Sequence, residues 1–242
     1  AAEMREYEAD YQKWQASIDA CRAENPNVTW KELHERCGEC PWPQPTGWQS
    51  PFCPNNLHRT MMQRVAPYTL RGFLYYQGEE DVVRYEGYSD MMIALVKQWR
   101  MDWNDWSLPF LFVQLPMYLA IDTEDDKKWA MQREQQAIAA AMLKRVGMIS
   151  MTDCGEFDNI HPLDKETPGT RLALLAEQMV YGTGEELTPT VQQMYSDGTA
   201  LYLVFDHVAD GLVIHASQPE TCQIAGADGV YYPAKAEVLH TN

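Results

Sequence analysis

Between residues 70 and 182, short apolar runs alternate with segments that have the character of helices, and this alternation limits the folds open to the chain. The apolar runs are LRGFLYY at 70–76, LPFLFVQL at 108–115 and GMISMTD at 147–153. Runs of this length and composition are typical of strands buried on both faces. Strands that alternate with helices predict an α/β fold, in which helices cover both faces of a parallel sheet.

The segments between and after these runs are predicted to be helices. In 88–100, four large apolar residues recur at three- and four-residue steps and therefore share one helix face. The segment 128–145 is rich in strong helix formers, and 171–182 ends on a glycine, a common residue just past a helix end. In a sheet of this kind, ligands bind at the carboxyl ends of the strands.

The first 56 residues have a different pattern, typical of a helical lobe followed by a long proline-rich loop. Apolar residues at three- and four-residue steps predict a helix over 3–24. Thr29 and Glu32 form a capping-box sequence, which predicts a short second helix in WKELHERC. We therefore assign residues 1–56 to a helical insert or lobe.

After about residue 186 the pattern indicates strands alone, in ALYLVFDHV, GLVIHAS and CQIAGADGVYYPAKAEV. These strands are too few for a complete β-sandwich, so the segment is interpreted as part of one. The predicted organisation is therefore the helical lobe, an α/β domain over 57–185 and a β-rich C-terminal region over 186–242.

The chain carries 35 acidic and 19 basic residues, which gives a net charge of −16 and a pI of about 4.7. A surface of this charge repels nucleic-acid phosphates and anionic lipid headgroups, so we expect neither nucleic acid nor a membrane as a partner. No apolar run approaches the length needed to span a bilayer. The charge fits a neutral substrate, or an acidic substrate held in a local basic pocket.

The cysteines leave three possibilities open. Cys21, Cys37, Cys40 and Cys53 lie in the first 53 residues. They could form structural disulfides, which would favour an oxidising compartment, or remain free or redox-active thiols. Alternatively, Cys37, Cys40 and Cys53 could bind zinc together with His58, although this set lacks a second paired spacing.

The loop FDNIHPLDK at 157–165 carries an aspartate three residues before a histidine, after the third predicted strand. In a turn, this spacing lets the Asp158 carboxylate reach the near nitrogen of His161, so that the far nitrogen can accept a proton. Pro162 restricts the backbone of His161 and thereby the direction of its ring. The pattern is compatible with an acid–base pair, but an ordinary solvated loop, in which Asp, Asn and His are common, would carry the same residues.

A metal site is a further alternative for the same loop. Five potential ligands lie within twelve residues, namely Asp153, Glu156, Asp158, His161 and Asp164. Carboxylates with one histidine suit a hard or mixed-ligand cation. Spacing alone does not choose between a metal centre and a metal-free acid–base pair.

The end of the first predicted strand carries a second candidate group, Gln77, Gly78 and Glu79. A glutamine amide at a strand end can donate a hydrogen bond to a developing oxyanion, and a glycine lets its own N–H approach closely. An ordinary polar turn after a strand would have the same composition. With Gln114 and the segment 153–161, these residues define the predicted carboxyl edge of the sheet.

Several stretches in this order resemble the sialate O-acetylesterase family, a branch of the SGNH-type hydrolases that remove acetyl groups from sugars. PNNLHRTMM resembles a family segment that begins Pro-Ser-Gly-Leu-Tyr-Asn, and RGFLYYQGEED resembles its Lys-Gly-x-x-Trp-Tyr-Gln-Gly-Glu-Ser-Asn strand. DNIHPLDKETPGTRLAL is similar to its Asp-x-x-His-Pro segment and the helix that follows it. LPFLFVQLP, KWAMQREQQ, FDHVADGL and IAGADGVYYPA match further segments, so that the resemblance extends over about 54–238.

The resemblance implies a three-layer, flavodoxin-like SGNH hydrolase fold and ester hydrolysis that needs neither a metal nor another cofactor. His161 would then be the general base and Asp158 the acid that orients it. Gln77, with Gly78 and Glu79, would contact the oxyanion or the substrate, an acetylated carbohydrate. Members of the family attack the acetyl carbonyl with a serine and form an acetyl-enzyme. Family membership also suggests a secreted or periplasmic location.

The sequence departs from the family where the nucleophile is concerned. No Gly-Gln-Ser-Asn segment precedes the Gln-Gly-Glu strand, and the GWQS that ends at Ser50 lies in the proline-rich loop. Glu80 and Asp81 also replace the Ser-Asn that follows Gln-Gly-Glu in the family. We therefore expect the serine on a missing N-terminal segment or a companion N-terminal chain, or else self-association. The alternatives are a non-catalytic sugar-binding or assembly remnant and a metal-dependent hydrolase.

Overall fold

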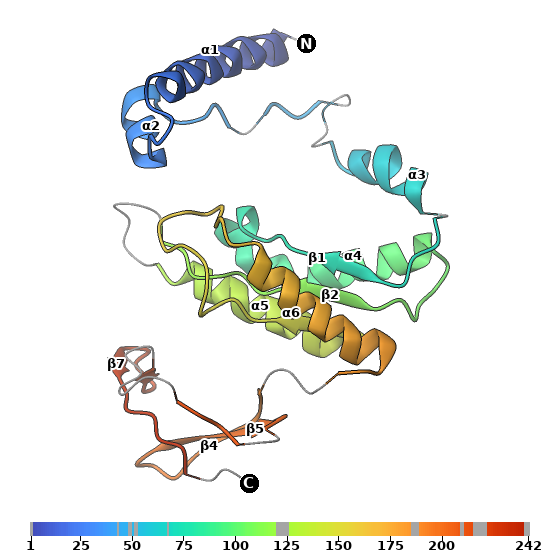
Figure 1. The fold of residues 1–242 in the computed structure, drawn as a ribbon, viewed down its shortest axis with the longest axis vertical. Helices are drawn as coiled ribbons and strands as arrows, with labels where there is room; N and C mark the ends of the chain where they lie inside the picture. The colour runs from blue at the N-terminus through green and yellow to red at the C-terminus, as the bar shows by residue number, and fades with distance from the viewer. Residues whose placement is uncertain are drawn as a thin grey trace.

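The computed structural model consists of a central α/β body with a helical pair on one side and small β-hairpins on the other (Figure 1). In the order of the chain, these parts are coloured from blue through green and yellow to red. The structure describes residues 2–42, 44–47, 50, 53–66, 68–119, 126–184, 189–208, 211–214 and 222–239.

Three parallel strands form the centre of the body, in the order β1, β2, β3. They are β1 (Phe73–Tyr75), β2 (Phe110–Val113) and β3 (Val146–Ile149). Phe73 lies opposite Phe110, and Phe110 lies opposite Val146. The predicted parallel sheet is confirmed, but its strands are shorter than expected. The third strand ends at Ile149 rather than 153, because the chain then enters a turn in which the Cys154 amide donates to the Met151 carbonyl.

Helices cover both faces of this sheet, which gives the three layers of an α/β fold. Alternation along β2 points Phe110 and Phe112 to one face, where they pack with α4 (Tyr88–Asp102) and α5 (Lys128–Met142). Leu111 and Val113 point to the other face and pack with Leu172 of α6 (Glu166–Ala176). All four residues of β2 are buried, because the strand has a neighbour on both edges and a helix on both faces.

Two short helical stretches were not predicted, and a third lies within the helix expected over 171–182. A π-helix (η1, His58–Met62) continues into α3 (Gln63–Val65), and a 3₁₀ helix (η2, Glu80–Gly87) leads into α4. A second π-helical turn (η3, Glu177–Tyr181) extends α6. π- and 3₁₀-helices have a different number of residues per turn from an α-helix, so the α-helical spacing of apolar residues does not predict them.

Two predicted helix boundaries were wrong for local reasons. The helix expected over 171–182 begins at Glu166, because the Asp164 carboxylate accepts a hydrogen bond from the Thr167 amide (3.0 Å) and so satisfies a free N–H of the first turn. The helix expected to reach residue 145 ends at Met142, because Leu143 is extended and Arg145 has a φ of 57°.

The N-terminal lobe is a pair of helices, α1 (Ala2–Glu24) and α2 (Trp30–Cys37), and its predicted capping box is confirmed. The Thr29 amide donates to Glu32 (2.8 Å), and the Glu32 amide donates to the Thr29 hydroxyl (3.3 Å). The two helices share a small core formed by Ile18, Cys21 and Leu33. All six cysteines are free thiols in this structure, although Sγ of Cys21 lies 3.3 Å from Sγ of Cys37.

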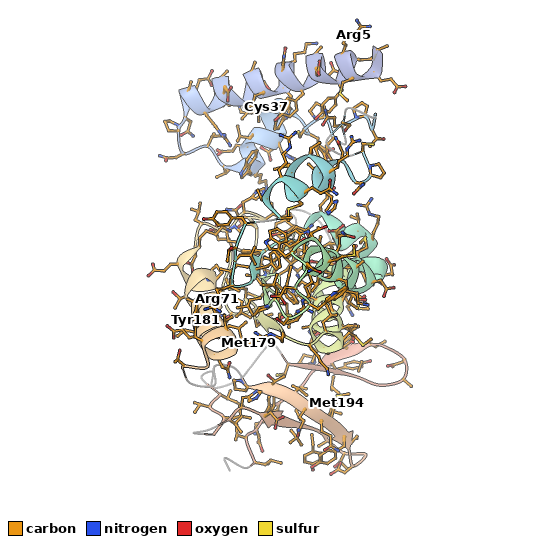
Figure 2. The ribbon with its side chains drawn as sticks, turned by 90° about the vertical axis from the view of Figure 1, so that its right-hand side faces the viewer. Arg5, Cys37, Arg71, Met179, Tyr181 and Met194 are labelled. Carbon is orange, nitrogen blue, oxygen red and sulfur yellow. The ribbon has the colours of Figure 1, made fainter. Side chains whose placement is uncertain are left out.

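The C-terminal region contains two separate antiparallel hairpins. They are formed by β4 (Thr190–Ser196) with β5 (Leu201–Asp206), and by β6 (Gln223–Ala225) with β7 (Tyr231–Pro233). Strand β4 was not predicted, and the expected strand at GLVIHAS is absent from 211–214, the part of it that the structure describes. Figure 2 shows Met194, on β4, at the far end of the molecule from Cys37, with the α/β body between them.

Like β3 on the other side, strand β1 forms an open edge of the central sheet in the described structure. It pairs with β2 on one side, where the Phe73 amide donates to the Pro109 carbonyl (2.9 Å). Because successive residues of a strand turn their amides to alternate sides, the amide and carbonyl of Leu74 face the open edge. The Leu74 side chain lies opposite Leu111 in the register and is 65% exposed. None of the described helices is both long and apolar enough to cross a membrane.

Candidate functional site

The loops that follow the three parallel strands lie side by side at one edge of the sheet. The Leu119 amide, after β2, donates to the Phe157 carbonyl (2.8 Å) in the loop after β3. In the same two loops, Gly155 packs closely against the ring of Pro116. The Lys165 ammonium lies 5.0 Å from the centre of the Tyr76 ring, at the end of β1. The structure therefore brings the Gln77 segment and the 157–165 loop to the same edge, as expected for parallel strands.

The side chain of Gln77 is fixed by hydrogen bonds at both ends of its amide. The Tyr75 hydroxyl donates to its Oε1 (2.9 Å), and its Nε2 donates to the Asp81 carboxylate (2.7 Å). Burial, together with the negative charges of Asp81 and Glu79, raises the pKa of Tyr75 to about 12, so this phenol stays a donor at neutral pH. One hydrogen of the Gln77 NH₂ group is used by Asp81, which leaves the second for another acceptor.

Gly78 occupies a backbone conformation that favours glycine, with a φ of 143°. A Cβ atom at this position would lie 3.1 Å from Nε2 of Gln132, 3.2 Å from the Tyr88 hydroxyl and 3.3 Å from Nε2 of Gln136. The residue is thus buried against three polar side chains of α4 and α5. Glu79, next along the chain, is half-buried.

Two acidic residues organise the loop after β3. Both oxygens of Asp153 accept hydrogen bonds from Arg171 (2.7 and 2.6 Å), which lowers the pKa of this carboxyl well below its usual range. Glu156 accepts hydrogen bonds from the Leu163 amide (2.6 Å) and from the Asn159 side chain (2.7 Å). These bonds hold the two ends of the loop together and to α6.

Asp158 and His161 both lie on this loop with exposed side chains. The Asn159 side chain accepts a hydrogen bond from the His161 amide (3.0 Å), which forms an Asx turn in the middle of the predicted pair. Within the described ranges, no hydrogen bond or ion pair joins the side chains of Asp158 and His161. The acid–base pairing of these residues therefore stays a prediction.

Neither metal alternative finds support in the described part of the chain, where no group of three or more His, Cys, Asp or Glu side chains could hold an ion. In the loop, Asp153 is bound to Arg171, and Asp164 caps α6. In the zinc set proposed from the cysteine spacing, His58 instead contacts the Asp102 carboxylate (2.7 Å).

The sequence analysis did not predict the buried polar residues that pack against Gly78. Gln132 and Gln136 are fully buried on α5, one turn apart, and Tyr88 on α4 is 3% exposed. A signal was present, because two glutamines separated by four residues occupy the buried face of a helix where apolar residues are expected. Gln114, predicted at the same edge, donates instead to the Arg133 carbonyl of α5 (3.0 Å).

An open apolar pocket of about 390 Å³ lies away from these residues. Its lining includes Met62, Val65, Tyr68, Phe73 and Trp103. It is located at the amino end of β1 and the end of α4, so it is opposite to the edge where parallel sheets bind ligands. Its lining offers few polar groups for chemistry.

Comparison with known proteins identifies the family. A family model described as "carbohydrate esterase, sialic acid-specific acetylesterase" matches residues 44–180, which is more than half of the chain. Sialate O-acetylesterases are 29% identical over 142 residues in Rattus norvegicus and 28% identical over 161 residues in Homo sapiens, and cover 52% and 60% of this chain.

A crystal structure of a carbohydrate acetylesterase from Xanthomonas citri aligns with 75% of this chain, with a TM-score of 0.69 and 32% identity. The chain spans 43% of that protein, and 26% and 30% of the rat and human relatives. The family model covers the loops after all three parallel strands, where the candidate residues lie. The chain therefore belongs to the carbohydrate esterase family of sialic acid-specific acetylesterases.

Proposed function

We propose that this protein hydrolyses acetyl esters on sugars by a Ser-His-Asp mechanism, with His161 as the general base and Asp158 as its orienting acid. The observation that carries the proposal is the family match over 44–180, which includes both this loop and the Gln77 strand end. The relatives named above are acetylesterases of sialate or of carbohydrate.

In the proposed reaction, a serine hydroxyl attacks the acetyl carbonyl while His161 accepts the hydroxyl proton. The carbonyl oxygen becomes an oxyanion, which accepts hydrogen bonds from the Gly78 N–H and the second hydrogen of the Gln77 amide. The sugar then leaves with the proton from His161. Water hydrolyses the acetyl-enzyme, again with His161 as base, and releases acetate and the free serine. Rotation of the exposed Asp158 and His161 side chains would be needed to form their pair.

We further propose that the serine is supplied by a segment or companion chain that adds a strand beside β1. The open edge of β1 and the exposed Leu74 side chain support this proposal, because a further strand and its connecting helix would cover both. The serines that the structure describes give no better candidate. Ser150 directly follows β3, but its hydroxyl contacts the Thr152 hydroxyl (3.2 Å). Ser50 is 1% exposed in the loop before η1.

The test is acetate release from an acetylated sugar and from an aryl acetate. It compares the 242-residue chain with the same chain joined to, or mixed with, the segment that carries the serine. We expect activity in the second form only. Intact-mass measurement of the protein purified from its source shows whether a companion chain is present. Secretion or a periplasmic location is proposed from the family alone.

In the active form, His161→Ala is expected to lower kcat on the order of a thousandfold or more, because the serine loses its base. His58→Ala is the control, since His58 contacts the Asp102 carboxylate near the end of α4, away from the 157–165 loop. It should leave kcat within about threefold at temperatures where the variant stays folded. An unimpaired His161→Ala enzyme would refute the assignment of the base.

A non-catalytic, sugar-binding remnant is the alternative function. The unpaired arrangement of Asp158 and His161 favours it, as does the lack, among the serines that the structure describes, of one at a suitable strand end. This alternative would be supported if neither form of the protein releases acetate, while calorimetry shows sugar binding and circular dichroism shows an intact fold.

A further inference from the structure

Two buried side chains hold the peptide group between Gln77 and Gly78 through hydrogen bonds to its carbonyl oxygen. The Tyr88 hydroxyl, on α4, donates to the Gln77 carbonyl oxygen (3.1 Å). Nε2 of Gln136, on α5, lies 3.4 Å from the same oxygen and within donating geometry. Both side chains are almost completely buried, at 3% and 0% exposure, so water does not compete for this carbonyl.

Gln136 is itself held by the strand next to β1. Its Oε1 accepts a hydrogen bond from the Leu115 amide (2.9 Å), and its Nε2 also lies 3.3 Å from the Val113 carbonyl. The side chain therefore links the carboxyl ends of β1 and β2. Its rotation would break bonds to both strand ends at once, so its direction is well determined.

Anchoring the carbonyl also determines where the Gly78 N–H points. In a planar trans peptide, the C=O and N–H bonds point in opposite directions. The Gln77 carbonyl points toward α4 and α5, so the Gly78 N–H points away from these helices. Within the described residues, this N–H has no hydrogen-bond partner. The hydrogen bonds from Tyr88 and Gln136 therefore fix the orientation of this peptide group relative to the two helices.

We propose that Tyr88 and Gln136 are positioning residues for the hydrolysis, which hold the Gln77–Gly78 peptide so that its N–H is directed at the oxyanion. This inference rests on the proposed esterase function. The two side chains act through the peptide and touch neither substrate nor the reacting atoms. Their effect is electrostatic preorganisation, because a donor that is already aimed needs no reorganisation when the negative charge develops.

Gln132 provides a matched control within the same helix. It is as fully buried as Gln136 and lies one turn earlier on α5, next to the same glycine. Neither atom of its amide has a hydrogen-bond partner within the described residues. Substitution of methionine, which has a similar shape, would therefore remove hydrogen bonds at position 136 and none at position 132.

The kinetic experiment uses the form of the protein that releases acetate. Gln136→Met and Tyr88→Phe should each lower kcat by roughly tenfold to a hundredfold while KM stays within about twofold, because only the transition state carries the oxyanion. Gln132→Met should leave both constants within about twofold. Equal effects of the two glutamine substitutions, or unchanged kcat in Gln136→Met and Tyr88→Phe, would overturn the inference.

A second readout does not depend on activity. In the 242-residue chain labelled with ¹⁵N-glycine, the Gly78 amide resonance should shift in Gln136→Met and Tyr88→Phe, and it should remain in place in Gln132→Met. An active protein whose Gly78 resonance stays unmoved in all three variants would overturn this inference alone. Absence of acetate release from the unsubstituted protein in every form would overturn the proposed function, and the catalytic role with it.

Discussion

Strands β2 and β5 have similar residues and opposite surroundings. The four residues of β2, FLFV, are all buried, whereas β5, LYLVFD, has no buried residue. Leu111 in β2 is 2% exposed and Leu203 in β5 is 48% exposed. Strand β2 lies between two other strands and two helical layers, while β5 pairs with β4 alone in the described structure. Strand-forming residues thus determine local conformation, but burial depends on neighbours that come from elsewhere in the chain.

The same contrast separates the central body from the N-terminal lobe. The body has two clusters of buried side chains on the two faces of one sheet, whereas the lobe has only three buried residues between its two helices. Burial of apolar surface contributes roughly 25 cal/mol per Å², so a lobe with so small a core gains little from it. We therefore expect the body to carry most of the stability and the flanking parts to tolerate substitution.

The largest effect is expected from one substitution made in both strands. Leu111→Ala should lower the free energy of unfolding by about 2–5 kcal/mol, because it removes buried methyl groups and leaves a cavity between β2 and α6. Leu203→Ala, the matched control, should change it by no more than about 0.5 kcal/mol. Urea unfolding followed by circular dichroism measures both. A loss above about 2 kcal/mol at Leu203 would show that β5 is covered in solution and would break the comparison.

An intermediate effect is expected in the N-terminal lobe. Because Sγ of Cys21 lies 3.3 Å from Sγ of Cys37, glutathione disulfide should oxidise the two thiols to a disulfide and be reduced to two molecules of glutathione. Closing a loop of this length stabilises the folded lobe by up to about 3 kcal/mol. Peptide mass spectrometry would identify the link, and hydrogen exchange in α1 would measure the stabilisation. Cys37→Ser is the control, and exchange that oxidation leaves unchanged would contradict the expectation.

The smallest effect concerns the ion pair between Asp153 and Arg171. Hydrogen bonds from Arg171 lower the pKa of Asp153 in the folded state, so the pair stabilises the fold above the unfolded pKa of about 4 and stops doing so as the pH falls through the folded value. The Asp153 side chain is 64% exposed, so the contribution should stay below about 1 kcal/mol. The stability difference between the protein and Asp153→Asn should therefore shrink below pH 4. A constant difference would contradict this assignment.

The sequence predicted the body of the fold well and its edges less well. The first two apolar runs contain β1 and β2, the third overlaps β3 from Gly147 to Ile149, and the capping box at Thr29 and Glu32 starts α2 as expected. The start of α6 was placed five residues late, because the Asp164 cap lies in a stretch with little helical period. Strand β4 was missed because TVQQMYS, which is exposed along its length, carries no alternation of apolar and polar residues.

The candidate site, like the fold, was predicted from the sequence only in part. Motif and spacing singled out Gln77, Gly78, Asp158 and His161, and the structure brings their loops to one edge. Motif alone did not find Tyr88 and Gln136, since their importance comes from hydrogen bonds to a carbonyl that is distant in sequence. The spacing of Asp158 and His161 also did not predict the direction of their side chains. In the structure, the Asn159 side chain accepts a hydrogen bond from the His161 amide.

By itself, the sequence determined the order of strands and helices and the residue types at the strand ends, because periodicity and local hydrogen bonding act over a few neighbouring residues. Only the tertiary structure decided which strands are covered, which of the two buried glutamines of α5 is hydrogen-bonded and where the Gly78 N–H points. These properties depend on contacts between segments that are far apart in the chain, and the energy of a buried polar group changes sign with the presence or absence of its partner.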